Sequence, residues 1–208
     1  MIWRLISVLL ISFSAFARPV SYSGGVTWMQ MNDKYSNSLH LHYSPNAKTS
    51  IGYKGEYFRS KKWQLHALQY NALLKRWNGK ASQANIYLKS AFGLAYDQDK
   101  NLEKEAGFLG LAMDAENRRL FASYENRYLK AADFEELIRH KVRLGVAPYI
   151  GDYGDLHSWL MVEISNNEKY EKDSYNITPF VRFFKDVYLV EIGANADGKI
   201  LFNSIIRF

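Results

Sequence analysis

Two closely spaced residue pairs, Met29 with Met31 and His40 with His42, have the side chains best suited to binding a metal ion. Residues two apart in a β-strand point to the same face, so each pair would present both side chains together. A hairpin register chosen to align all four sets Met29 opposite His42 and Met31 opposite His40. Two thioethers and two imidazoles suit a soft ion such as Cu(I). The alternative is that the methionines fill space and the histidines are ordinary interior residues.

Asp155 and His157 form a second candidate for chemistry, as an orienting carboxylate with a general base. They share one face of a strand, whereas Ser158 faces the other side because it is adjacent to His157. No recognisable hydrolase motif accompanies them. The alternative is a polar strand start beside the turn at 151–154. Asp155 and His157 are therefore the candidate catalytic residues for the alternative of an acyl or peptide hydrolase.

Composition excludes several kinds of site. The chain has no Cys, which removes disulfides, zinc–thiolate sites and Cys nucleophiles. Its formal net charge is +6, but no basic cluster is dense enough for nucleic acid, and we expect no such partner. The exposed cations Arg59, Lys61 and Lys62 suit the phosphates of lipopolysaccharide better.

The N-terminus has the order of regions typical of a secretory signal peptide. Arg4 supplies the positive charge, residues 5–13 are almost wholly apolar, and residues 15–17 form a small-x-small cleavage site. The apolar run is too short to span a bilayer comfortably. We therefore predict a signal peptide over 1–17 and an exported domain over 18–208; the alternative is a buried N-terminal element.

Apolar and polar residues alternate along most of the exported domain, which is the pattern of strands rather than helices. Twelve strands are predicted, with a range of eight to twelve for the fold, at 24–32, 38–45, 48–58, 62–74, 81–96, 105–114, 118–130, 137–150, 156–165, 175–184, 187–193 and 198–208. The alternation breaks within 63–77, where a β-bulge would repair it. Helical spacing over 133–140 predicts one helical turn there instead.

The connections between these strands alternate in length. The even-numbered turns, such as 45–47, 78–79 and 185–186, are short, whereas the odd-numbered ones at 97–105, 130–136 and 166–174 are longer and charged. Short turns at one end and longer loops at the other are typical of barrels in the bacterial outer membrane.

The last strand carries the most specific signal. Ile200, Phe202, Ile206 and Phe208 share one face, and the final residue is aromatic. This resembles the terminal strand of bacterial outer-membrane β-barrel proteins as a class, although Ser204 departs from that pattern. The resemblance covers about ten residues and identifies no specific family. It implies a transmembrane antiparallel up-and-down β-barrel, porin-like and Gram-negative, with these four residues as the signal to the barrel assembly machinery.

In such a barrel the polar faces of the strands would line the lumen. Aromatic residues near strand ends, including Trp28, Trp63 and Tyr128, are expected in interfacial girdles. The expected lumen residues are Lys54, Glu56, Lys89, Glu125, Arg127, Lys141, Arg143, Glu163, Arg182, Glu191 and Arg207.

The sequence favours a narrow channel, solute-binding barrel or structural barrel in the outer membrane, surrounded by lipid and lipopolysaccharide. No cofactor is expected beyond a soft metal ion. The alternatives are an outer-membrane enzyme and a soluble periplasmic ligand-binding β-barrel.

Overall fold

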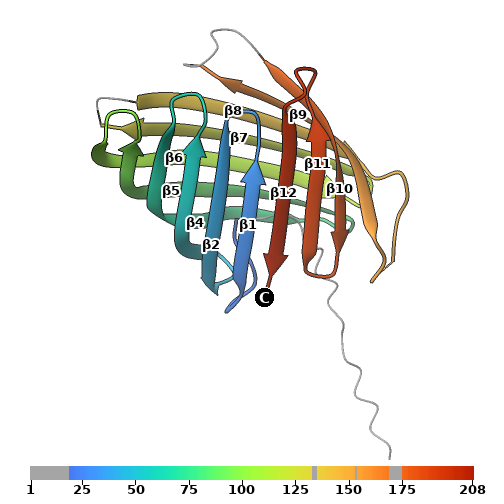
Figure 1. The fold of residues 1–208 in the computed structure, drawn as a ribbon. Helices are drawn as coiled ribbons and strands as arrows, with labels where there is room; N and C mark the ends of the chain where they lie inside the picture. The colour runs from blue at the N-terminus through green and yellow to red at the C-terminus, as the bar shows by residue number, and fades with distance from the viewer. Residues whose placement is uncertain (1–18, 133–134, 153, 169–174) are drawn as a thin grey trace, which may run out of the picture.

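The structure is a computed structural model that describes residues 19–132, 135–152, 154–168 and 175–208. The predicted signal peptide, 1–17, lies outside the described residues. The described strands are β1 (Val26–Asn32), β2 (Ser36–Asn46), β3 (Thr49–Phe58), β4 (Trp63–Asn78), β5 (Ser82–Asp97), β6 (Leu102–Asn117), β7 (Leu120–Ala131), β8 (Glu135–Val146), β9 (His157–Asn167), β10 (Asn176–Lys185), β11 (Tyr188–Ala194) and β12 (Ile200–Arg207) (Figure 1).

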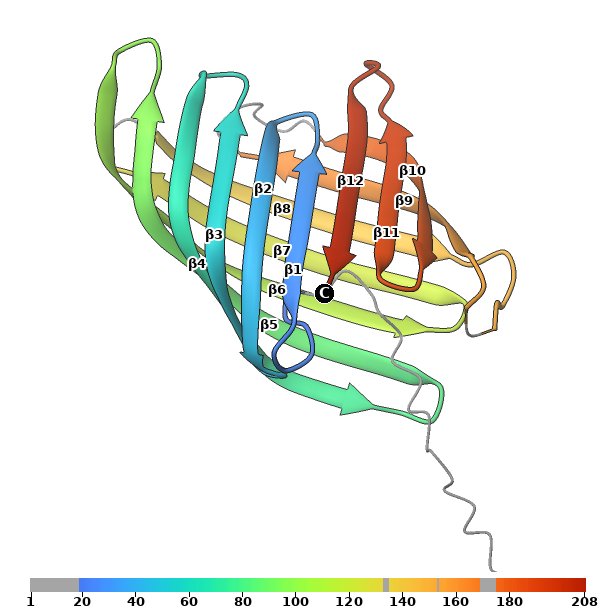
Figure 2. The ribbon, with the colours of Figure 1, turned by 60° about the horizontal axis from the view of Figure 1, so that its bottom comes forward.

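The sheet closes on itself. Each strand pairs antiparallel with the next along the chain, and β12 pairs with β1 through partners such as Met29 with Ile205 (Figure 2). The backbone of Phe208 continues this pairing, because its N–H donates to the Val26 carbonyl at 2.8 Å. The predicted all-β, up-and-down barrel of about twelve strands is confirmed. In the part of the chain that the structure describes, no helix has the length and hydropathy needed to cross a membrane.

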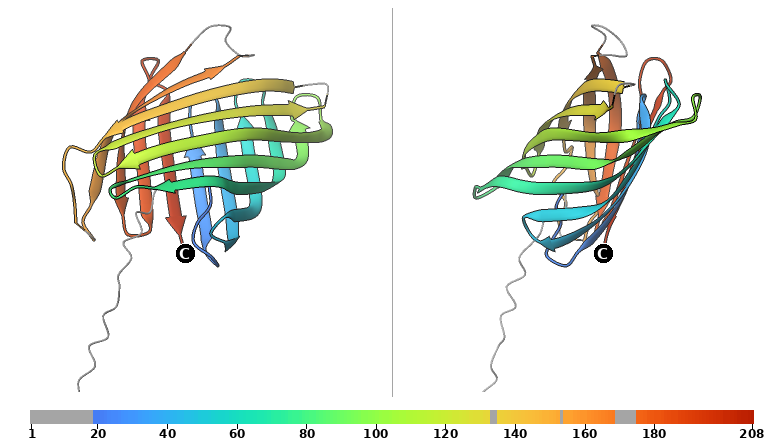
Figure 3. Two further views of the ribbon diagram at one scale, coloured as in Figure 1. Left: turned by 180° about the vertical axis from the view of Figure 1, so that it is seen from behind. Right: turned by 90° about the vertical axis from the view of Figure 1, so that its left-hand side faces the viewer.

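The barrel is uneven in height and in strand direction. β4, β5 and β6 each have 16 residues, whereas β1 and β11 each have 7. In Figure 1 the strands β1, β2, β11 and β12 run steeply, and they cross β5 to β8, which run nearly level behind them; the views in Figure 3 show the same arrangement. Side chains from the two crossing walls therefore meet inside the barrel.

The outer wall is apolar and the inner wall is largely polar. Large side chains such as Leu41, Phe92 and Leu160 are exposed on the outside. Along β4 both faces are apolar: Trp63 and Leu65 are buried inside, while Leu68 points outward and is 61% exposed. This explains the broken alternation, because an internal apolar cluster and an outer wall meet on one strand.

The bulge predicted within 63–77 is confirmed, and it lies between Leu73 and Lys75. The residues of β4 before it stay in register with β5. One other prediction for this region needs correction. Trp63, expected in an outer aromatic girdle, is instead stacked on Phe58 inside the barrel, with ring centroids 4.0 Å apart.

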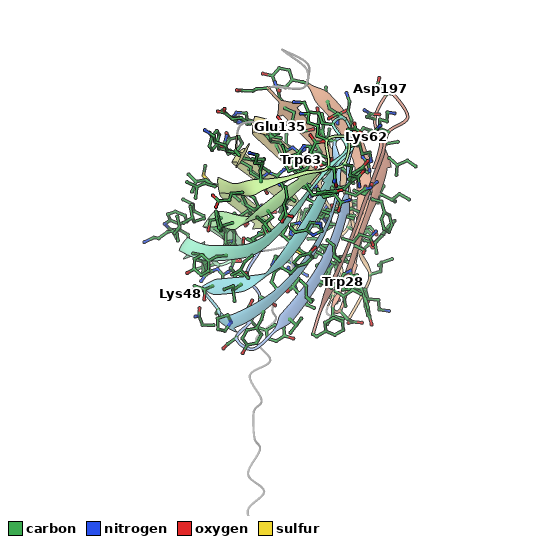
Figure 4. All side chains as sticks on the ribbon, turned by 60° about the vertical axis from the view of Figure 1, so that its left-hand side comes forward. Trp28, Lys48, Lys62, Trp63, Glu135 and Asp197 are labelled. Carbon is green, nitrogen blue, oxygen red and sulfur yellow. The ribbon has the colours of Figure 1, made fainter. Side chains whose placement is uncertain are left out.

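The connections form two distinct ends, which we call the loop end and the turn end. The loop end carries 33–35, 59–62, 98–101, 195–199 and the links between β7 and β8 and between β9 and β10. The turn end carries 47–48, 79–81, 118–119, 186–187 and the β8–β9 connection. Lys62, Glu135 and Asp197 lie together at the loop end, away from Lys48 at the turn end (Figure 4).

The connections also differ from two expectations. The β8–β9 connection, 147–156, is long although it lies on the side predicted to have short turns. The helical turn predicted over 133–140 is wrong for its described part, because Glu135 begins β8 and pairs with Ala131. The apolar spacing that suggested a helix reflects buried Leu137 on the inner face and Ile138 on the outer face.

The segment before β1 enters the mouth of the barrel at the turn end. Val20 is buried and packs with Tyr87 and Ala112 on the inner wall. The Pro19 carbonyl accepts a hydrogen bond from the Ser50 hydroxyl at 2.7 Å. Pro19 and Val20 therefore narrow this mouth.

Candidate functional site in the charged barrel interior

The residues expected in the lumen lie on the inner face, where most are buried. Glu163 and Glu191 are each 1% exposed, and Arg182 is 2% exposed. A buried charge is costly unless it is paired and hydrogen-bonded. These side chains meet that condition by forming a network of ion pairs across the interior.

Glu56 of β3 is the centre of the first part of this network. Its carboxylate accepts two hydrogen bonds from Arg127 of β7, at 2.6 and 2.9 Å, in the bidentate geometry that makes such pairs strong. It also accepts one from the Ser36 hydroxyl at 2.8 Å and lies 3.1 Å from the Lys54 ammonium. Because β3 and β7 are not neighbours in the sheet, this pair spans the lumen.

Glu191 of β11 is the centre of the second part. Its carboxylate lies 3.1 Å from Arg143 of β8 and 2.6 Å from Arg182 of β10, and accepts a hydrogen bond from the Asn203 amide at 2.6 Å. Arg143 also pairs with Glu163 at 2.7 Å. The pair between β8 and β11 again joins strands that are not adjacent.

Asp33, in the connection between β1 and β2, links these two parts at the loop end. Its carboxylate lies 3.4 Å from Arg139 and 3.5 Å from Lys141, both on β8. Burial opposes ionisation, but the two cations and the backbone N–H groups of Ser36 and Tyr35 outweigh it. Together they hold the pKa of Asp33 at about 2, below its ordinary 3.8.

Sequence reasoning missed Asp33 and Arg139. Arg139 has the same parity as Lys141 and Arg143, and this signal was hidden because residues 133–140 were interpreted as a helical turn. Asp33 lies in a turn, where alternation carries no information about which way a side chain points.

The interior encloses a cavity of about 150 Å³. Seven cations line it, namely Lys54, Lys89, Arg127, Arg139, Lys141, Arg143 and Arg182, against five acids, namely Asp33, Glu56, Asp114, Glu125 and Glu191. Lys89 and Glu125 form a further pair at 2.6 Å. The lining therefore carries more positive than negative charge.

Several guanidinium N–H groups beside this cavity are buried without a hydrogen-bond acceptor. Among the described residues, none accepts from Nε or Nη2 of Arg139 or from Nη1 of Arg182. A buried donor without an acceptor costs about 1–3 kcal/mol, and more when it is charged. A solute that brings an acceptor oxygen would satisfy these N–H groups, and an anion would do so best.

The hairpin that carries Met29, Met31, His40 and His42 pairs in a different register from the predicted one. Met29 lies opposite His40, and Met31 lies opposite Ser38. The four side chains still line one cavity, because the shift is by two residues and preserves the faces. His40 Nε2 lies 2.9 Å from the Lys54 ammonium, which competes with a metal ion for the same nitrogen.

Asp155 and His157 contact different partners in this structure. The Asp155 carboxylate accepts a hydrogen bond from the backbone N–H of Asp152 at 2.9 Å, whereas the His157 ring contacts Phe184. Both lie beside Gly151 at the turn end, with no hydrogen bond between them. In the described part of the chain, no group of three His, Asp or Glu residues is placed to hold a metal ion.

A closed antiparallel barrel with an apolar outer wall and a charged interior defines the class of transmembrane β-barrels, in which every backbone group is paired within the sheet. No protein-family model and no curated protein matches the sequence. The structure is similar to the KdgM porin, solved in complex with disordered oligogalacturonate. The TM-score is 0.52 and the identity 10%, over 88% of this chain and 98% of that one.

Two further outer-membrane barrels are less similar. LpxR from Salmonella typhimurium gives a TM-score of 0.45 at 7% identity, over 88% of this chain and 99% of that one. Acinetobacter baumannii OccAB4 gives 0.41 at 9% identity, over 86% of this chain and 55% of that one. At these identities the similarity to the porin concerns the fold, which is that of bacterial outer-membrane β-barrel proteins.

Proposed function

We propose that this protein is an integral outer-membrane β-barrel whose narrow lumen binds and passes small anionic solutes. The loop end faces the cell exterior, and the turn end faces the periplasm. The apolar outer wall supports the membrane location, because side chains such as Leu160 would otherwise meet water over the whole circumference.

One observation carries the choice of solute. The cavity is lined by more cations than acids, and Arg139 and Arg182 bring buried N–H groups that no described residue accepts from. A small carboxylate or phosphate would supply the missing acceptors. The ion pairs across the lumen, such as Glu56 with Arg127, would restrict passage to small solutes.

Planar-bilayer recording of the purified full chain tests this proposal. We expect a small conductance whose reversal potential in a KCl gradient shows preference for anions. The substitution Arg182→Gln should reduce that preference, whereas Lys48→Gln, at an exposed turn outside the lumen, should leave it unchanged.

Three outcomes would overturn the proposal. A cation preference in the wild-type protein would contradict the assigned solute. Absence of conductance in samples whose closed barrel is verified by heat-modifiable migration on SDS gels would instead favour a structural barrel. Recovery of the protein in the soluble periplasmic fraction would reject the membrane location itself.

A further inference from the structure

The outer wall carries a polar groove where a transmembrane barrel normally presents apolar side chains. It runs across β1 to β4 near the loop end and has a volume of about 410 Å³. Its lining includes Gln30, Tyr53, Gly55, Gln64 and His66. Neither the lumen nor the ion-pair network described above uses these side chains.

Gly55 creates the hollow, and a row of polar groups borders it. A Cβ atom at Gly55 would lie 2.8 Å from the Tyr53 hydroxyl, so the tyrosine lies over the glycine. The hydroxyl lies 2.7 Å from Nδ1 of His66, and Nε2 of that ring lies 3.1 Å from the Gln64 side-chain oxygen. The row is ordered by its own hydrogen bonds. Among the described residues, none accepts a hydrogen bond from the Gln64 amide nitrogen.

Gln30 makes the strongest case for an external partner. It is exposed on the outer wall, and among the described residues no side chain or backbone group bonds to its amide. Trp28, 40% exposed on the same strand, lies further from the loop end and has the character of an interfacial aromatic residue. The groove therefore lies between the aromatic level and the loops, where lipid headgroups are found.

Positive charge lies directly above the groove. The Arg59 guanidinium donates hydrogen bonds to the side-chain oxygens of Asn32 and Asn37, which border the groove. These acceptors are neutral, and no carboxylate within the described residues forms an ion pair with Arg59. The neighbouring Lys61 and Lys62 are about half exposed or more, and their ammonium groups pair with Glu135 and Asp99.

We propose that this groove binds the phosphorylated sugar headgroup of a lipid in the surrounding leaflet. The phosphate lies at Arg59, the hydroxyls contact the row from Gln30 to His66, and the acyl chains follow Trp28 and Leu39. Three strand spacings separate β1 from β4, which is about 14 Å. That width suits a sugar better than a glycerophosphate. The inference depends on the membrane location in the proposed function but not on the solute.

Native mass spectrometry of the full chain tests the groove, with release from nanodiscs that contain phosphatidylcholine and one probe lipid. The probes are a bisphosphorylated, acylated glucosamine disaccharide and phosphatidylglycerol. We expect the saccharolipid to stay bound in preference to the other two. Arg59→Gln should reduce retention about tenfold, since a hydrogen bond to a charged group contributes about 1.5 kcal/mol. Gln30→Leu should reduce it less, and Lys48→Gln should not change it.

Three controls accompany this test. Heat-modifiable migration must show that every variant forms a closed barrel. Bilayer conductance should be unchanged in Gln30→Leu, because this side chain is exposed on the outer wall. Inorganic phosphate should not displace the lipid.

Equal retention of all three lipids, or displacement by inorganic phosphate, would overturn the inference. So would cross-linking between copies of the variant Gln64→Cys, because a second copy would then cover the groove. Any of these outcomes in a membrane-inserted, conducting protein would leave the proposed function intact.

Discussion

Glu56 shows how single residues hold the walls of this barrel together. It neutralises cations from its own strand and from β7, and its nearest partners are fully enclosed by the interior. Removing one member of a buried ion pair costs about 3–5 kcal/mol, because the other charge remains buried without compensation. Glu56 is therefore the residue whose neutralisation should most disturb the interior.

We expect Glu56→Gln to lower the free energy of unfolding by about 3 kcal/mol. Urea titration followed by tryptophan fluorescence in detergent micelles measures the change. The double variant Glu56→Gln with Arg127→Met should recover part of the loss, because it removes the uncompensated cation as well. An unchanged unfolding midpoint in Glu56→Gln would mean that solvent, rather than Glu56, neutralises these cations.

Asp33 should make the stability of the barrel depend on pH in the acidic range. Its pKa is about 2 in the folded protein and near 3.8 in the unfolded chain, so its contribution is complete above pH 4. It is lost as the pH falls from about 4 to about 2, and amounts to about 2 kcal/mol. The difference in urea midpoint between wild type and Asp33→Asn should therefore shrink over this range. A difference independent of pH would contradict the assignment.

The soft-metal hypothesis for Met29, Met31, His40 and His42 stays a prediction, and two variants test it in opposite directions. Replacing both histidines with Ala should abolish Cu(I) binding, as measured by competition with a chromogenic chelator. Lys54→Met should strengthen binding, because the ammonium 2.9 Å from His40 Nε2 would no longer compete. Equal copper binding by the wild-type and double-histidine variants would eliminate the site.

At the scale of elements, close approach between β4 and β5 depends on Gly93. A Cβ atom there would lie 2.0 Å from the His66 carbonyl oxygen and 2.5 Å from Cα of Ala67. Backbone atoms cannot move aside as a flexible side chain can. Gly93→Ala should therefore destabilise the barrel by about 1–3 kcal/mol or more. Ser90→Ala, facing outward on the same strand, is the matched control, and similar urea midpoints for both variants would refute the argument.

The sequence predicted the strands well because apolar and polar residues alternate with a period of two along most of the barrel. The alternation arises because the outer wall is apolar and the inner wall is charged. The prediction failed where that contrast disappears. Trp63 and Leu65 line an apolar part of the interior, so polarity could not distinguish the two faces of β4. The start of β8 failed similarly, because buried Leu137 precedes outward-facing Ile138.

The interior charges were also predictable as a set but not as pairs. Parity identifies Glu56 and Arg127 as inward-facing residues, yet their contact joins positions 71 residues apart. That contact depends on strand tilt and on the crossing of the two walls, which no local pattern encodes. The sequence did not predict the outer groove, because the groove exists where Gly55 has no side chain.

At the scale of the whole molecule, the pairing of β1 with β12 closes the barrel. At this seam, an effect of a substitution on barrel stability can be distinguished from an effect on barrel assembly. Phe208 pairs with Val26 through its backbone, while its side chain is 66% exposed on the outer wall. Phe208→Ala should therefore leave the unfolding midpoint of the refolded barrel nearly unchanged. Its yield in the outer membrane should fall, if Ile200, Phe202, Ile206 and Phe208 are the signal read by the assembly machinery.

Quantitative immunoblotting of outer-membrane fractions measures that yield, with Ser204→Ala as the control on the same face. A normal yield of Phe208→Ala would exclude Phe208 from the signal. A reduced midpoint in the refolded protein would show that the side chain acts on stability instead.

The two apolar faces of β4 have a consequence for the unfolded chain. In the finished barrel Trp63 and Leu65 are covered by neighbours and Leu68 would be covered by lipid, but an unfolded chain in water has neither covering. A β-prone segment that is apolar on both sides is a preferred site of aggregation. In a chain exported as proposed, residues 63–70 would therefore be the segment that a holdase chaperone protects most. A peptide of this segment should compete for such a chaperone better than one from β7.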